Sequence, residues 1–224
     1  MIGDSLPCEA QGGAKRRASD YMKDMKMFRV TLAAAALAFS ALPVAADQLS
    51  LTQLSRYLNG LKSAQAEFTQ INNDGTISTG TIFIKRPGRA RFEYNPPVEA
   101  LVIAGGQQVA IFDGKSNTGP TQYPLKRTPL NLILAKNIDL ARAQMVVGHT
   151  YDGTSTTVQA QDPDHPEYGT IELFFTASPV ELRQWVITDN AGEQTTVILG
   201  EMDKTVSFGS AMFNITIEAQ KRGG

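Results

Sequence analysis

Cysteine is nearly absent from this chain of 224 residues, and the single one, Cys8, lies close to the N-terminus. Only two histidines occur, His149 and His165. The sequence also lacks a glycine-rich phosphate loop and a nucleophile elbow. These absences leave little basis for a disulfide framework or for thiol or histidine chemistry, so we expect no enzyme, no catalytic residue and no cofactor.

Long apolar runs are also lacking, with one exception near the N-terminus, Thr31–Leu42. This run is shorter than the roughly 20 residues that a membrane-spanning helix needs. Small residues that suit signal-peptide cleavage follow it at Val44-Ala45-Ala46. Basic residues precede it at Lys23, Lys26 and Arg29. The order of these features predicts a secretory signal peptide.

We therefore expect a signal peptide over 27–46, preceded by an extension over 1–26 that does not belong to the native protein. The mature chain would begin at Asp47, form a single domain over 47–224 and reside in the periplasm. Its length of about 178 residues is ample for one hydrophobic core. A membrane-anchored lipoprotein would need a cysteine directly after the cleavage site, where Asp47 stands.

Basic charge is scarce in the expected mature chain. Removal of residues 1–46 takes away six of the 21 basic and four of the 22 acidic side chains, which leaves a net charge of about −3. A slightly acidic chain without a basic run does not resemble a nucleic-acid-binding protein. The polybasic amphipathic helix of a stable membrane-surface protein is also missing.

One acidic segment, Asp162–Glu167, includes His165 and could in principle bind a metal ion. Its prolines and its irregular ligand spacing favour a solvated loop instead. We therefore expect no metal site.

A short amphipathic helix is predicted directly after Asp47. Ser50 and Gln53 form a capping-box pair, and Leu49 and Leu54 could form a hydrophobic staple across it. Asn59-Gly60 indicates that the helix stops nearby. The apolar stripe consists of Leu51, Leu54, Leu58 and Leu61.

Alternating strand patterns dominate the rest of the chain, separated by turn signals such as Asn72–Gly75 and Asp189–Gly192. Their spacing is typical of a meandering antiparallel sheet that is long enough to curl toward a barrel. The expected strands cover 64–71, a pair within 80–94, 100–104, 108–113, 154–161, 170–176, 182–188, 195–202 and 214–219.

The hairpin Gly80–Pro97 is the most informative segment. Pro87-Gly88 supplies its turn, and the spacing of Ile82 and Ile84 places Arg86 on the same apolar strand face. A charged side chain in such a position is costly without a partner. Arg86 is therefore either a rim residue paired with a carboxylate or a functional residue.

One segment interrupts the strands. Thr128-Pro129 predicts a helix start before the almost wholly apolar run Leu130–Ala135, and 138–147 suggests a second short helix. An apolar helix within a β meander must be buried. The open mouth of a curled sheet is the economical place for it.

These motifs resemble the LolA family, the periplasmic carriers of outer-membrane lipoproteins. The resemblance covers essentially the whole expected mature chain and is strongest over 64–135. It rests on Phe68-Thr69-Gln70, Gly80-x-Ile82-x-Ile84-Lys-Arg-Pro-Gly88, Arg91-Phe-Glu-Tyr-x-x-Pro97, Val109-x-Ile111-x-Asp113, and Gln122-Tyr-Pro-Leu125 followed by Thr128-Pro-Leu130.

The resemblance implies a mainly β (α+β) fold: an unclosed antiparallel β-barrel with an N-terminal helix and a lid of short helices over an apolar cavity. It implies that Arg86 is a latch whose contact with lid backbone opens and closes during loading and release. The lid would contain Leu130, Leu132, Ile133 and Leu134. The cavity for acyl chains would be lined by Phe68, Ile82, Ile84, Phe92, Tyr94, Leu101 and Ile103.

The implied partners are lipoproteins, an inner-membrane ABC-type complex that releases them, and an outer-membrane acceptor protein or the outer membrane itself. We expect a monomer that binds no nucleic acid. An alternative is a related open-barrel domain that senses lipid or lipoprotein, but a sensor would need a second domain or a membrane anchor. The carrier is therefore the leading hypothesis.

Overall fold

The computed structural model describes residues 47–115 and 118–222, so the expectations for the signal peptide and the extension lie outside the described residues. The elements in chain order are α1 Leu51–Gly60, β1 Ser63–Ile71, β2 Ile77–Lys85, β3 Ala90–Tyr94, β4 Ala100–Gly105, β5 Gln108–Asp113, β6 Thr121–Pro124, the 3-10 helix η1 Leu125–Arg127, α2 Leu130–Leu134, β7 Val146–Tyr151, β8 Thr156–Gln161, the 3-10 helix η2 Pro166–Tyr168, β9 Thr170–Ala177, β10 Val180–Thr188, β11 Gln194–Leu199, the 3-10 helix η3 Ser210–Phe213 and α3 Ile215–Arg222.

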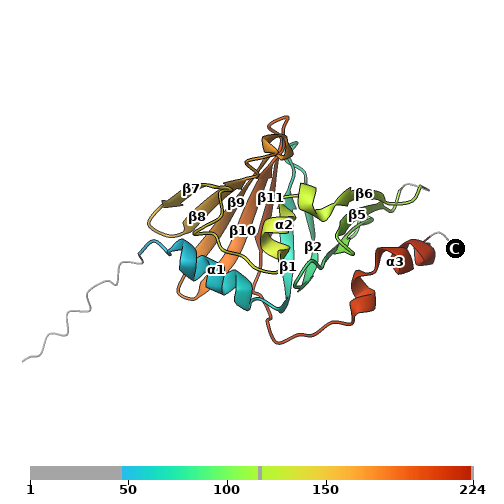
Figure 1. Cartoon of the computed structure of the whole chain (residues 1–224). Coiled ribbons are helices and arrows are strands. Elements are labelled where there is room, and N and C mark those ends of the chain that lie inside the picture. The colour runs from blue at the N-terminus through green and yellow to red at the C-terminus, as the bar shows by residue number, and fades with distance from the viewer. Residues whose placement is uncertain (1–46, 116–117, 223–224) are drawn as a thin grey trace, which may run out of the picture. The chain divides into compact units, whose positions relative to one another are not determined.

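All eleven strands form one antiparallel sheet in the order β6-β5-β4-β3-β2-β1-β11-β10-β9-β8-β7 (Figure 1). The two edge strands, β6 and β7, are not paired with each other, so the sheet stays unclosed. The expected fold class, an unclosed antiparallel sheet with a few helices, is confirmed. Within the described ranges, no helix has the length and apolar character needed to cross a membrane.

Helix α1 begins as the sequence predicts. The Ser50 hydroxyl accepts a hydrogen bond from the backbone N–H of Gln53 at 3.3 Å, and the Gln53 side chain accepts one from the Ser50 N–H at 2.8 Å. Leu54 and Leu58 point into the sheet and are completely buried. The capping box thus fixes the helix start, and the apolar stripe fixes which side packs on the sheet.

Helices cover both faces of the sheet. Helices α1 and α2 lie on the same side in Figure 1, and their leucines join the larger cluster of buried residues. Helix α3 contacts a second, smaller cluster formed by Leu101, Ile103, Ala110 and Phe112. We call the face under α1 and α2 the inner face.

Two sequence predictions about local structure are wrong. Residues 215–222 form helix α3 rather than a strand, because Ile215 and Ala219 are spaced to pack on one sheet face and the Asn214 side chain accepts a hydrogen bond from the Ile217 N–H at 3.0 Å. Residues 138–145 form turns and no second lid helix, while β7 follows at 146–151. A short edge strand, β6, also forms at Thr121–Pro124, where the predicted strands leave a gap.

Candidate functional site

An apolar wall forms on the inner face where β1, β2 and β3 lie side by side. Register places Ile82 opposite Phe92 on β3 and Ala66 on β1, and places Phe68 opposite Gly80. Phe68, Ile82, Ile84 and Phe92 are each at most 6 % exposed. The structure thus brings together the side chains that strand parity assigns to one face.

Aromatic side chains fill the centre of this wall because Gly80 leaves room for one of them. A Cβ atom at position 80 would lie 2.8 Å from the Phe68 ring and 2.1 Å from the Glu93 carbonyl oxygen, so only glycine fits. The Phe68 ring makes edge-to-face contacts with Phe92 at 5.7 Å and Tyr94 at 5.1 Å between ring centroids. Such pairs favour a defined arrangement over a loose one.

Tyr94 combines an apolar body with a satisfied polar end. Its hydroxyl donates a hydrogen bond to Gln70 Oε1 at 2.7 Å. Burial raises the pKa of Tyr94 to about 12, because the phenolate would lose its hydration among apolar side chains. Tyr94 therefore stays neutral at physiological pH.

The expectation for Leu101 and Ile103 is wrong. They pair with Glu93 and Arg91, whereas Val102 pairs with Phe92 and shares the inner face. Both side chains are buried on the opposite face, in the cluster that helix α3 covers. The run Leu-Val-Ile is apolar on both faces, so its parity could not be assigned from the sequence.

A lid covers the apolar wall. We define it as residues 125–140, which include η1, α2 and the segment after α2. Leu132, Ile133 and Leu134 are 9 %, 2 % and 2 % exposed and belong to the same cluster as Phe92, while Leu130 is half-buried against it. The lid side chains thus occupy the space over the wall, and the open apolar cavity expected from the resemblance is closed in this structure.

Arg86 lies under the lid at the end of β2. It is 7 % exposed, and its Nη2 donates a hydrogen bond to the Ala135 carbonyl at 2.5 Å, just after α2. A longer bond from Nη2 reaches Asn59 Oδ1 at 3.4 Å. Among the described residues, Arg86 forms no ion pair with a carboxylate, and its Nε and Nη1 have no hydrogen-bond partner.

This environment argues against a paired rim arginine. Burial alone lowers the pKa of Arg86, with no neighbouring charge to oppose the shift. The guanidinium nevertheless stays protonated, because the pKa of arginine is so high. The turn next to Arg86 also contacts the lid, since the Gly88 N–H donates to the Leu134 carbonyl at 2.8 Å.

A second polar anchor joins the lid to α1. The Asn59 side chain pairs with both backbone groups of Ile138: Nδ2 donates to the carbonyl at 2.7 Å, and Oδ1 accepts from the N–H at 3.0 Å. One turn earlier, the Ser55 hydroxyl accepts from the Leu140 N–H at 2.9 Å. Sequence reasoning missed this role, because Asn59-Gly60 also serves as a helix stop and Ile138 is 79 residues away.

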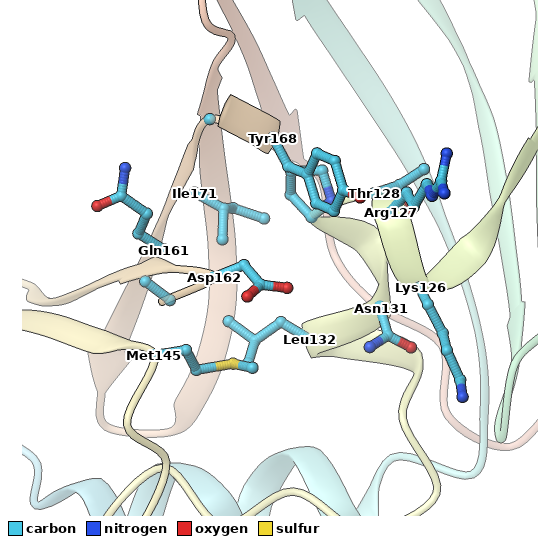
Figure 2. A pocket seen from close by; sticks show the side chains of 13 residues that line it. Lys126, Arg127, Thr128, Asn131, Leu132, Met145, Gln161, Asp162, Tyr168 and Ile171 are labelled. Carbon is cyan, nitrogen blue, oxygen red and sulfur yellow. The ribbon is translucent and has the colours of Figure 1, made fainter. Parts of the chain in front are cut away.

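A small cavity remains beside α2 (Figure 2). Its volume is about 50 Å³, room for a few water molecules at most. Figure 2 shows Leu132 of the lid facing Met145, and Thr128 facing Tyr168 of η2. Ala160 and Ile171, from β8 and β9, complete its apolar end.

The histidines make structural contacts. His149 Nε2 lies 2.9 Å from the Leu49 carbonyl oxygen. His165 Nδ1 lies 2.9 Å from Glu167 Oε1, and the His165 ring stacks on Tyr168. In the parts of the chain that the structure describes, no three His, Cys, Asp or Glu side chains gather in a way that could hold a metal ion.

Comparison with known proteins identifies the family. Residues 59–216 match the family model described as "Outer membrane lipoprotein carrier protein LolA". The match covers well over half of the chain, including the wall, Arg86 and the lid. The chain belongs to the LolA family.

Individual relatives carry the same description. The outer-membrane lipoprotein carrier protein of Cupriavidus taiwanensis is 28 % identical over 197 residues, which cover 83 % of this chain and 92 % of the relative. That of Dechloromonas aromatica is 27 % identical over 205 residues, covering 86 % and 95 %. A solved LolA superfamily protein from Nitrosomonas europaea aligns with a TM-score of 0.42 at 9 % identity, over 74 % of this chain and 98 % of that one.

Proposed function

We propose that this protein is a periplasmic carrier that binds the acyl chains of lipoproteins released from the inner membrane and transfers them to the outer membrane. Family membership supports the cargo class, and the apolar wall under a separate lid supports the binding mode. The proposal includes processing at Asp47, function as a monomer and action by binding rather than catalysis.

Arg86 is the observation that carries this proposal. A buried cation that contacts only a carbonyl and an amide oxygen is poorly stabilised, because two of its nitrogens lack partners among the described residues. A residue selected only for stability would be apolar or paired with a carboxylate. Its position under the lid suits a contact that holds the empty state closed and can be broken.

Energetics explain why a carrier would need such a contact. Burial of an acyl chain contributes about 0.8 kcal/mol per methylene group. Several full chains would exceed the practical limit of roughly 18–21 kcal/mol for noncovalent binding, and cargo bound so tightly could not be delivered. Opening a lid that is held by Arg86 lowers the net affinity, because the loaded state gives up the closed-state contacts.

The proposed partners follow from this cycle. An inner-membrane ABC-type complex would supply the lipoprotein, and an outer-membrane acceptor or the membrane itself would receive it. In the proposed loaded state, acyl chains would take the place on the wall that the lid side chains Leu130, Leu132, Ile133 and Leu134 occupy in the empty state.

Mass spectrometry of the protein purified gently from its own periplasm tests the proposal. We expect acylated lipoproteins to co-purify with it. A control in which Phe92 is replaced by Glu should lose this cargo while still accumulating as a folded protein. If the wild-type protein carries no acylated cargo even when lipoprotein release to the outer membrane is blocked, the proposal is wrong.

A further inference from the structure

The hydrogen bonds that hold the lid come from two directions. On the side of the β2–β3 and β4–β5 turns, the Gly88 N–H and Arg86 donate to the end of α2, and the Leu125 N–H donates to the Gln107 carbonyl at 2.8 Å. From α1, Ser55 and Asn59 bind the backbone of residues 138–140. Both ends of the lid are therefore fastened.

The third side of the lid is different. We call it the seam: the boundary between α2 and the strands β8 and β9 with η2, where the small cavity lies (Figure 2). Among residues 47–115 and 118–222, no hydrogen bond or ion pair crosses it. Arg127 makes only a minor contribution to the lowered pKa of Glu167, which results mainly from hydrogen bonding to the Glu167 backbone N–H and to His165.

The lining of the seam leads directly into the apolar core. Leu132, Ala160 and Ile171 belong to the cluster that contains the wall, and Met145 packs against this cluster. Polar and charged side chains complete the lining, with Lys126 and Arg127 exposed and with Thr128, Asn131, Gln161, Asp162 and Tyr168 partly buried. This distribution suits a lipid with an apolar tail and a polar head.

A larger cleft lies on the other side of the lid, beside the β2–β3 turn, with a volume of about 540 Å³. Its lining includes Arg89, Lys126 and Lys136, and no acidic side chain contributes to it. Charged side chains line both openings, since Lys126, Arg127 and Asp162 contribute to the seam. An acyl chain that passed at the cleft would also have to cross the Gly88 and Arg86 hydrogen bonds, whereas no hydrogen bond between described residues crosses the seam. The cleft is therefore a poorer passage for acyl chains than the seam, despite its size.

We propose that acyl chains enter and leave through the seam, an inference that rests on the carrier function proposed above. The lid lifts on this side and pivots on its fastened ends. The tilt of α2 breaks the hydrogen bond from Arg86 to the Ala135 carbonyl by a small displacement, while Gly88 stays bonded to Leu134 and residues 138–140 stay on α1. The polar linkage between acyl chains and peptide then lies at the rim, against Arg127, Gln161 and Tyr168.

Cross-linking across each side of the lid tests this proposal. All variants are made in the full chain with Cys8→Ser. Two double-cysteine variants, Thr128→Cys/Tyr168→Cys and Leu132→Cys/Met145→Cys, allow the seam to be cross-linked. The cross-linker is a bismaleimide that a reductant cleaves. The matched control pair, Arg89→Cys/Lys136→Cys, closes the opposite cleft. Uptake and release of a fluorescent fatty-acyl probe are measured before cross-linking, after it and after reductive cleavage.

We expect either seam cross-link to slow uptake and release roughly tenfold or more, and cleavage to restore them, while the control cross-link leaves both rates nearly unchanged. A control cross-link that blocks as strongly as the seam cross-links would mean that the whole lid must detach. Unchanged rates in the cross-linked seam would place the passage elsewhere. Either result overturns the proposal, whereas an uncross-linked protein that binds no probe contradicts the carrier function itself.

Discussion

Replacement of Asn59 by alanine should loosen the lid more than any other single change on α1. The substitution removes the hydrogen-bond partners of both the N–H and the carbonyl of Ile138, a residue that is only 5 % exposed. It also removes one acceptor of Arg86. A buried backbone group that loses its partner costs about 1–3 kcal/mol. Water that reaches the opened segment and the better helix propensity of alanine offset a part of this cost.

We therefore expect Asn59→Ala to lower the free energy of lid opening by about 2–3 kcal/mol, which increases the equilibrium constant for opening by a factor of roughly 30 to 150. Hydrogen–deuterium exchange followed by mass spectrometry measures this directly as faster exchange in peptides that cover residues 134–140. Peptides from β9 and β10 serve as the internal reference, since strand pairing there does not involve α1.

Asn59→Asp is the matched control. Two effects of this substitution are favourable: the carboxylate still accepts from the Ile138 N–H, and its negative charge lies near Arg86 Nη2. Two are unfavourable: a carboxylate oxygen faces the Ile138 carbonyl, and the charge lies near the negative end of the helix dipole. We expect its exchange rates to lie between those of the wild type and Asn59→Ala. If Asn59→Ala exchanges at the wild-type rate, Asn59 does not anchor the lid.

Four further results are expected. Arg86→Leu should fold and accept lipoprotein but transfer it to acceptor membranes more slowly, because the closed empty state loses the bond to Ala135; transfer at the wild-type rate would make Arg86 a structural residue only. Phe92→Glu should abolish binding of a fatty-acyl probe, because a carboxylate among acyl chains costs several kcal/mol, and should still fold, because lifting the lid admits water to the charge; failure to fold would favour a solid core. The pKa of Tyr94 in the folded protein, about 12, exceeds that of an unfolded tyrosine, so its stabilising effect should be complete below about pH 10 and should be lost as the pH rises toward 12; denaturant unfolding at several pH values should show this loss, and Tyr94→Phe should remove it. N-terminal sequencing of periplasmic protein should find Asp47 as the first residue, and a product that retains Cys8 would refute the expected processing.

Strand parity is the part of the site that the sequence determines best. Alternation assigns Ile82 and Ile84 to one face, and the short Pro87-Gly88 turn then sets the face of Phe92. The same logic fails at Leu101 and Ile103, because β4 is apolar on both faces and carries no alternation to read. Only the distant helix α3, packed on that outer face, shows where these two side chains belong.

Long-range polar contacts could not be predicted from local patterns. The capping box of α1 depends on residues three positions apart, so the sequence displays it directly. Asn59 and Ser55 instead bind backbone 79 and 85 residues away, and backbone groups carry no sequence signature. The burial of Arg86 was predictable from its strand face, but the absence of a carboxylate near it, among the described residues, required the structure.

The filled space under the lid limits how tightly cargo can bind. Leu132, Ile133 and Leu134 already bury their side chains against the wall, and burial of each contributes about 1.5–3 kcal/mol. An acyl chain that takes their place exchanges one apolar contact for another, so up to roughly 5–9 kcal/mol of its own burial is offset. The unmatched nitrogens of Arg86 act in the opposite direction, because hydration of this side chain favours opening. Good apolar packing therefore keeps the lid closed in the empty state. The lack of hydrogen bonds across the seam, among the described residues, lets thermal motion open the lid for both loading and release.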